Sequence, residues 1–252
     1  MEQNKPLVSI VTVTYNAEKV LERTLESIKA QTYTNFEYII VDGASDDGTL
    51  AIAKKHGTTI DKLISEPDKG LYDAMNKGLT LATGKYVWFM NAGDEIYAPD
   101  TLQQIAANCN SQNADIIYGE TMITAEDGSE IGLRRLKAPK QLTKRSFLKG
   151  MLISHQAVLV NRNIATKYDL KYKYSADYNW LLQSIFNSKN NCNSELILAK
   201  FLDGGQTKQT IVPGLKERFK IMVLHYGIIR TVLNHIPIAF KFFSFLFKNK
   251  RF

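Results

Sequence analysis

Strand-like and helix-like segments alternate through the first hundred residues, and this order constrains the fold more than any other feature. Apolar runs rich in β-branched residues at 7–13, 36–41, 60–65 and 86–90 predict four strands. The segments between them carry apolar residues at helical spacing. This alternation predicts an α/β fold with a mostly parallel central sheet flanked by helices.

The second half of the chain is less regular. Strands are expected at 115–118, 157–160 and 195–201, and a helix near 177–187. Residues 119–135 predict a hairpin with its turn at Glu126-Asp127-Gly128. We expect one domain over residues 1–215, in which 7–100 and 101–215 form two halves, followed by a separate tail at 216–252.

The tail, residues 216–252, carries the charge of the protein. It contains eight basic residues and one acid, so its net charge of +7 equals that of the whole chain. Polar residues interrupt any apolar stretch long enough to span a bilayer. A basic amphipathic helix suits an anionic membrane surface better than nucleic acid, so we expect a membrane surface as its partner and no nucleic acid. Packing on the protein body or on a second subunit is the alternative. Apolar residues recur in the tail at helical spacing: Phe219, Met222, Val223, Tyr226, Ile229 and Leu233.

Polar residues directly follow three of the predicted strands. They are Thr14-Tyr15-Asn16, Asp42 and Asn91–Asp94. Because parallel sheets bind ligands beyond the carboxyl ends of their strands, these residues predict a ligand site at one edge.

Three aspartates have side chains suited to chemistry at such a site. Asp42 can accept hydrogen bonds from a nucleobase or a ribose, and Asp94 after Gly93 can hold Mg²⁺ or Mn²⁺ against a diphosphate. Asp177, at the start of a predicted helix, can take a proton from a hydroxyl. Each also has a structural interpretation as a turn or capping residue, and the lone His155 as a satisfied core histidine.

Motifs of other site types are missing from the sequence. No GxGxxG follows the first strand, and the stretch from Gly78 to Lys85 is one residue too long for a P-loop. HExxH, GxSxG and zinc-binding cysteine clusters are also missing. Cys109 and Cys192 are far apart in sequence, so we expect both to be reduced, and we expect no signal peptide at the N-terminus.

The motifs as a set resemble the family 2 glycosyltransferases of the GT-A fold, especially those that build bacterial capsule, exopolysaccharide and O-antigen units. The resemblance is carried by SIVTVTYNAEKVLERTLESIKAQTYTNFEYIIVDGASDDGT and SEPDKGLYDAMNKGLTLATGKYVWFMNAGD, within residues 7–100. It is weaker over 150–207, in SHQAVLV, YSADYNW and FLDGGQT. It implies inverting, metal-dependent transfer of a sugar from a nucleotide-sugar donor, usually a UDP-sugar, to a saccharide or lipid-linked acceptor. It also implies a cytoplasmic enzyme, peripheral on the inner face of the bacterial plasma membrane.

The resemblance also implies roles by position. Asp94 would bind Mn²⁺ or Mg²⁺, and Asp177 would be the catalytic base. The acceptor side would include His155, Asp203 and Gly204. The donor side would include Thr12, Tyr15, Asn16, Asp42, Asp68, Lys69 and Asn91.

Two departures from the family pattern matter. The chain has Asp42-Gly43 where paired aspartates are common, and Asn91-Ala-Gly-Asp94 in place of Asp-x-Asp. The second leaves Asp94 as the sole carboxylate ligand. Two other functions stay open: a nucleotidyltransferase, which lacks its glycine-rich phosphate loop here, and a non-catalytic binding protein. The sequence leaves homo-oligomerisation open.

Overall fold

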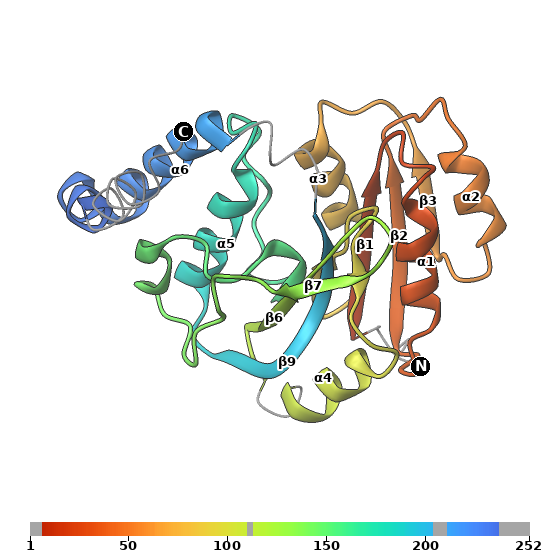
Figure 1. Cartoon of the computed structure of the whole chain (residues 1–252), viewed down its shortest axis with the longest axis horizontal. Helices are drawn as coiled ribbons and strands as arrows, with labels where there is room; N and C mark the ends of the chain where they lie inside the picture. The colour runs from red at the N-terminus through yellow and green to blue at the C-terminus, as the bar shows by residue number, and fades with distance from the viewer. Residues whose placement is uncertain (1–6, 110–112, 204–210, 237–252) are drawn as a thin grey trace.

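The computed structural model describes residues 7–109, 113–203 and 211–236 (Figure 1). Nine strands within these residues form one sheet, in the order β3-β2-β1-β4-β8-β6-β9-β5, with β7 paired to β6. The strands are β1 (Val8–Thr14), β2 (Phe36–Asp42), β3 (Lys62–Ser65), β4 (Tyr86–Phe89), β5 (Glu95–Ile96), β6 (Ile116–Thr124), β7 (Glu130–Leu133), β8 (Val158–Asn161) and β9 (Asn191–Leu202). The helices are α1 (Leu21–Lys29), α2 (Thr49–Lys55), α3 (Leu71–Leu81), α4 (Thr101–Cys109), α5 (Ala176–Asn187) and α6 (Ile211–Tyr226), with the short 3₁₀ helices η2 (Ser146–Lys149) and η3 (His155–Ala157).

The sheet is parallel in its first half and mixed in its second. Strands β1 to β4 pair in parallel, as predicted. The predicted α/β fold with helices flanking a central sheet is confirmed. The second half of the sheet is mixed: β6 and β9 pair in parallel, whereas β8 is antiparallel to both β4 and β6, and β5 and β7 also pair antiparallel. In the strand order, β1 lies between β2 and β4, so the winding of the chain reverses there. The carboxyl ends of β1 and β4 flank this switch point, where open α/β sheets bind ligands.

Alternate residues of each strand pack into two separate cores. Ile10 faces the core under α1 and α4, while its neighbour Val11 faces the core under α3 and α5. Figure 1 shows α1 and α3 on opposite sides of the strands. A Cβ atom at Gly78 in α3 would collide with the Val11 side chain, so glycine allows this helix to lie directly on β1.

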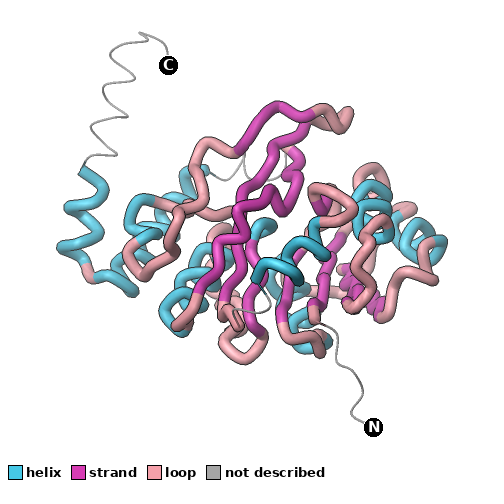
Figure 2. Tube along the Cα trace, turned by 90° about the horizontal axis from the view of Figure 1, so that it is seen from below, coloured by secondary structure: helices cyan, strands magenta, loops and turns pink. Residues whose placement is uncertain are grey.

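The C-terminal segment begins as a helix packed on α5. Helix α6 starts at Ile211, five residues before the expected boundary, and its Ile221 and Met222 are buried in the core shared with α5. A second helical segment, 228–236, follows Gly227, and its His235 ring packs 5.1 Å from the ring of Phe219. Figure 2 shows these helices at one end of the molecule. No helix among the described residues has the length and apolar character needed to cross a membrane.

The two cysteines contradict the expectation of free thiols. Cys109, at the end of α4, forms a disulfide with Cys192, in β9. Both side chains are buried. Their separation of 83 positions concealed this proximity, because α4 packs against β9 only in the folded chain.

Candidate active site

Ser45 joins the loops that follow β1 and β2. Its Oγ donates to Oδ1 of the fully buried Asp42 and accepts a hydrogen bond of 2.9 Å from the Asn16 backbone N–H. The Asn16 side chain in turn accepts from the Asp46 N–H at 3.1 Å, and Ser65 Oγ donates to Asp42 Oδ2 at 2.6 Å. Asp42 and Asn16, both predicted donor-side residues, therefore belong to one hydrogen-bonded group. In this group Asp42 is a buried anchor, and the exposed Asn16 lies at the surface.

Gly43 brings two further predicted residues together. A Cβ atom at Gly43 would lie 2.5 Å from Oδ2 of Asp68 and 3.3 Å from Cδ2 of Tyr15. A side chain at position 43 would therefore require the Asp68 carboxylate to move. The Tyr15 side chain is 63% exposed and offers an aromatic face beside the Asp68 carboxylate.

The prediction that Thr12 lines the nucleoside pocket is corrected by its contacts. Thr12 is fully buried, and its hydroxyl donates to the Met90 carbonyl at 2.7 Å and accepts from the Tyr38 hydroxyl at 2.9 Å. Because its hydroxyl is fully buried and both donates and accepts inside the protein, Thr12 joins β1 to its neighbouring strands and its side chain does not reach the surface.

The segment before α3 carries Asp68 and Lys69. Asp68 Oδ1 accepts from the Gly70 N–H at 2.7 Å, and the backbone N–H of Lys69 donates to Asp73 at 3.0 Å. These bonds hold the start of α3, where Gly70 has a positive φ of 109°. The Lys69 side chain is exposed and forms no ion pair among the described residues, so its charge is available to a ligand.

Asp94 is a buried carboxylate in the turn after β4. Its Oδ2 accepts from Gln156 Nε2 at 2.9 Å and its Oδ1 from the Leu202 N–H at 3.3 Å. Burial raises the pKa of Asp94 to about 7, and the neighbouring Glu95 adds to the shift. In the same turn, Oδ1 of Asn91 is buried and has no hydrogen-bond partner among the described residues. The Asp94 carboxylate in its ionised form and the unsatisfied amide oxygen of Asn91 are oxygen ligands of the kind that Mg²⁺ or Mn²⁺ prefers.

Asp177 lies in the first turn of α5 and is half-buried. Its Oδ1 accepts from the Tyr72 hydroxyl at 3.2 Å and from the Tyr178 N–H at 2.8 Å. Among the described residues no hydrogen bond engages Oδ2. One carboxylate oxygen is thus held in place while the other is left to receive a proton.

A continuous set of contacts links Asp94 to Asp177 through η3. Gln156 of η3 binds Asp94, and the adjacent His155 lies 2.6 Å from the Tyr168 hydroxyl through its Nε2. The Tyr168 ring stacks on the ring of Tyr72, with 5.7 Å between centroids, and Tyr72 donates to Asp177. Because Tyr72 follows the Asp68–Gly70 turn by two residues, the start of α3 also connects this group to Tyr15 and Gly43.

The predicted acceptor-side residues have different surroundings. His155 is buried among aromatic rings, and burial lowers its pKa to about 4, so its imidazole is neutral at pH 7. This geometry favours the structural interpretation of His155. Asp203 is half-buried at the end of β9, where its N–H donates to the Thr124 carbonyl at 2.8 Å. Gly204 lies outside the described residues.

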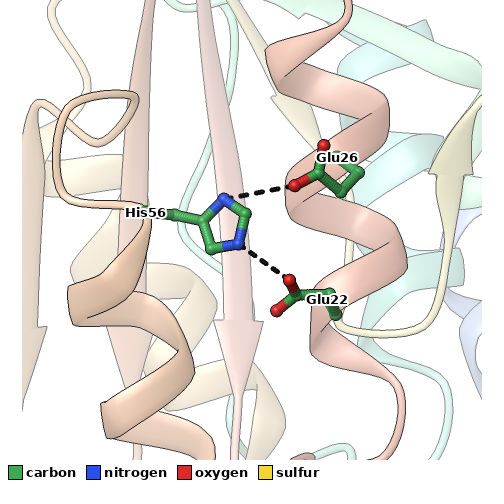
Figure 3. Close-up of side chains that lie close together, drawn as sticks. All are labelled: Glu22, Glu26 and His56. Carbon is green, nitrogen blue, oxygen red and sulfur yellow. Dashed lines mark hydrogen bonds and ion pairs between the residues drawn. The ribbon is translucent and has the colours of Figure 1, made fainter.

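A second group of possible metal ligands lies between α1 and α2 (Figure 3). The Nε2 atom of His56 is 3.1 Å from Glu22 and its Nδ1 is 3.7 Å from Glu26. Lys55 also contacts Glu22 at 3.2 Å. Since each ring nitrogen faces a different carboxylate and a lysine shares one of them, this arrangement is an ion-paired contact between two helices.

Sequence reasoning missed Tyr72, Gln156 and Ser45 as members of the site. Tyr72 lies in a predicted helix among apolar residues, so its spacing indicates a core position. Gln156 is uncharged and stands in no motif, and Ser45 is one of several polar turn residues. The repeated Asp-Gly and Ser-Asp pattern after Asp42 marked the turn but did not indicate which hydroxyl would bind the aspartate.

The parallel β1–β4 half, its switch point and the aspartates beyond it define a GT-A fold. The structure of TarS residues 1–349 from S. aureus in complex with UDP superposes with a TM-score of 0.70 at 19% identity, and covers 86% of our chain and 64% of the TarS chain. Our chain therefore spans less than two thirds of that structure.

The chain belongs to glycosyltransferase family 2. The family model described as glycosyl transferase family 2 matches residues 9–168. A PGL/p-HBAD biosynthesis glycosyltransferase of Mycobacterium bovis (strain BCG / Pasteur 1173P2) is 33% identical over 218 residues, covering 82% of our chain and 81% of the relative. A presumed teichuronic acid biosynthesis glycosyltransferase, TuaG of Bacillus subtilis (strain 168), is 32% identical over 179 residues, covering 66% of our chain and 70% of the relative.

Proposed function

We propose that the protein is an inverting, metal-dependent glycosyltransferase that uses a UDP-sugar. Its acceptor is a saccharide, carried on a lipid, in the synthesis of a bacterial surface polysaccharide. The observation that carries the proposal is the linked pair Asp94 and Asp177, joined through η3 and Tyr72 at the carboxyl edge of the sheet. The UDP complex of TarS supports the choice of UDP as the nucleotide. The relatives from Mycobacterium bovis and Bacillus subtilis support a cell-surface glycoconjugate as the product.

In the proposed reaction Asp177 is the general base. Its Oδ2 takes the proton of an acceptor hydroxyl while that oxygen attacks the anomeric carbon of the donor. The bond from this carbon to the diphosphate oxygen breaks, and its electron pair leaves with the nucleoside diphosphate. Attack on the face opposite the leaving group inverts the anomeric configuration. A positioned base of this kind contributes roughly 10²–10⁴-fold to the rate.

The donor is held at the other end of the site. Tyr15 offers its exposed ring to the nucleobase of the donor. Asp68 offers a carboxylate to the ribose, and Lys69 offers an ammonium group to the phosphates. Asp94 and Asn91 would hold Mn²⁺ or Mg²⁺, which supplies Lewis-acid stabilisation of the departing diphosphate when bound. Gln156 keeps the Asp94 carboxylate in its orientation through the 2.9 Å hydrogen bond.

The test combines donor binding and turnover in one variant. We expect Asp177→Asn to bind UDP with unchanged affinity in a thermal-shift titration with Mn²⁺, and to lose sugar transfer and UDP-sugar hydrolysis by about 10²-fold or more. Asp100→Asn, an exposed aspartate before α4, is the matched control and retains turnover. Normal turnover by Asp177→Asn would show that Asp177 is not the general base. A wild-type protein that binds UDP-sugars but neither transfers nor hydrolyses them is a binding protein.

A further inference from the structure

Two arginines near Asp177 have no carboxylate partner among the described residues. Arg134 directly follows β7, and Arg218 lies on α6. Among the described residues neither guanidinium forms an ion pair within 4.0 Å. Within the described part of the chain, Arg134 Nη1 makes one long hydrogen bond of 3.4 Å, to the Leu136 carbonyl, and the buried Arg218 Nε has no hydrogen-bond partner. A half-buried guanidinium with unsatisfied donors costs free energy unless an anion accepts from it.

Helix α6 is fixed over the segment that leads to Asp177. The Glu217 carboxylate accepts from the backbone N–H groups of Lys173 and Tyr174, each at 2.9 Å. One turn earlier, Ser175 Oγ donates to the Gly214 carbonyl at 3.1 Å. These bonds determine the place of Arg218, whose guanidinium carbon lies 5.9 Å from the centroid of the Tyr178 ring, next in sequence to Asp177.

Electrostatic interactions connect Arg134 to Arg218 and to Asp177. Burial lowers the pKa of Arg134, and the positive charges of Arg218 and Arg135 lower it further, while Glu120 and Asp177 act in the opposite direction. The two guanidinium groups are therefore close enough to repel each other. The N-terminus of α5 adds partial positive charge at the same place.

We propose that Arg134 and Arg218 bind a phosphate group of the acceptor. The proposal rests on the assignment of Asp177 as base, because the acceptor hydroxyl must reach that residue. Arg218 lies beside Tyr178, the neighbour of Asp177, and Arg134 interacts electrostatically with Asp177, whereas the donor diphosphate is assigned to Asp94, which Gln156 contacts. A guanidinium presents a planar pair of donors that matches two phosphate oxygens. The phosphate is thereby recognised beside the hydroxyl that reacts.

Isothermal titration of methyl phosphate into the full-length protein, saturated with UDP and Mg²⁺, tests this site. Bound UDP occupies the donor site, so methyl phosphate reports on the acceptor side. We expect Arg134→Gln and Arg218→Gln each to weaken methyl phosphate binding by about tenfold or more, and to change UDP affinity by less than twofold. Arg218→Lys keeps the charge without the planar fork and is expected to weaken binding less. The control is Arg145→Gln, an exposed arginine elsewhere, which leaves both affinities unchanged.

The alternatives give distinct results. Equal methyl phosphate affinity in the wild type and both glutamine variants, or no binding by the wild type, overturns the proposal. A loss of UDP affinity of tenfold or more assigns the arginines to the donor diphosphate and also overturns it. If the wild type binds no UDP, the proposed function fails, and the same titration without UDP still decides whether the arginines bind phosphate. Thermal denaturation of each variant identifies any that does not fold. The conclusion then rests on the variants that do fold.

Discussion

The Tyr72 hydroxyl lies 3.2 Å from Oδ1 of Asp177, although 105 positions separate these residues in the chain. Burial raises the pKa of Tyr72 well above its usual value, and the neighbouring Asp177 carboxylate adds to the rise. The phenol therefore stays protonated and donates to the carboxylate. Helix α3, which starts beside the donor-side residues, in this way orients the residue that we assign as base on α5.

The first prediction concerns this contact. Tyr72→Phe removes the donated hydrogen bond and keeps the ring stacked on Tyr168, so we expect kcat to fall by roughly 3–30-fold with the KM for the donor within twofold. Steady-state kinetics with a UDP-sugar measure both constants. Tyr33→Phe, a half-buried tyrosine away from the site, is the control. A raised KM with an unchanged kcat would show that Tyr72 serves donor binding and does not position Asp177.

The second prediction concerns Ser45, whose hydroxyl joins Asp42 to the Asn16 backbone. Ser45→Ala removes the hydroxyl that joins the two loops. We expect the Kd for UDP to rise about 3–10-fold, because binding must then order loops that this hydrogen bond holds in place in the wild type. Ser129→Ala is matched to it, since Ser129 Oγ also donates to a nearby aspartate, Asp127, in the remote β6–β7 turn. Equal UDP affinity in Ser45→Ala and wild type would refute a role for this bridge.

The third prediction uses the pKa of Asp94, which burial raises from its usual 3.8 to about 7. The fold favours the protonated carboxyl, so this contribution to stability is complete below about pH 4 and is lost as the pH rises through 7. Without metal, Asp94→Asn should therefore be more stable than wild type at pH 8, by roughly 1–3 kcal/mol, and closer to it at pH 5.

Thermal denaturation in EDTA at both pH values checks the effect on Asp94. Mn²⁺ should raise the Tm of wild type at pH 8 and leave that of Asp94→Asn unchanged, because only the ionised carboxylate binds the ion. Asp100→Asn serves as the control for loss of a negative charge. A variant that is less stable than wild type at pH 8 in EDTA would contradict the assignment of the raised pKa.

The fourth prediction concerns the Cys109–Cys192 disulfide. The bond closes a loop of about the 83 positions that separate the cysteines, so its reduction should lower the free energy of unfolding by about 2–4 kcal/mol. We expect neither cysteine to be alkylated in the unfolded protein without reductant. The double variant Cys109→Ser with Cys192→Ser should be insensitive to dithiothreitol. Alkylation of both cysteines without prior reduction would show that the bond does not form.

The fifth prediction concerns the exposed apolar residues of 228–236. Ile229 is 73% exposed and Leu233 is 59% exposed, next to basic residues of the tail. Replacing both with glutamate should abolish flotation with anionic vesicles and preserve the Tm, because neither side chain is in the core. Deleting the whole tail from residue 216 is a poorer test, since it removes the buried Ile221 and Met222. Ile131→Glu, at an equally exposed site on β7, is the control, and unchanged flotation of the double variant would end the membrane proposal.

Local patterns accounted for much of the fold. Strands β1 to β4, helix α5 and the hairpin formed by β6 and β7 occur where spacing and turn residues predict them. Residues after the strand ends were predicted to meet at one edge. Asn16 and Asp42 meet through Ser45, and Tyr15 and Asp68 lie beside Gly43, whereas the side chain of Asp94 is hydrogen-bonded to Gln156 and Leu202. These features follow from periodicity and from the geometry of parallel strands, which operate over a few residues at a time.

Other features depended on packing between distant segments. The antiparallel insertion of β8 between β4 and β6 and the burial of Thr12 against Tyr38 and Met90 have no local signature. The disulfide likewise joins residues that only α4 and β9 bring together.

The sequence alone identifies the strands, the helices and the aspartates that suit a nucleotide-sugar and its metal. Only the tertiary structure shows that Tyr72 holds Asp177, that Gln156 holds Asp94, and that Arg134 and Arg218 form no ion pair with any described residue. The physical reason is that the packing of the hydrophobic cores determines which distant segments come into contact. These contacts set the partner, the charge and the orientation of each side chain, and local sequence patterns do not contain that information.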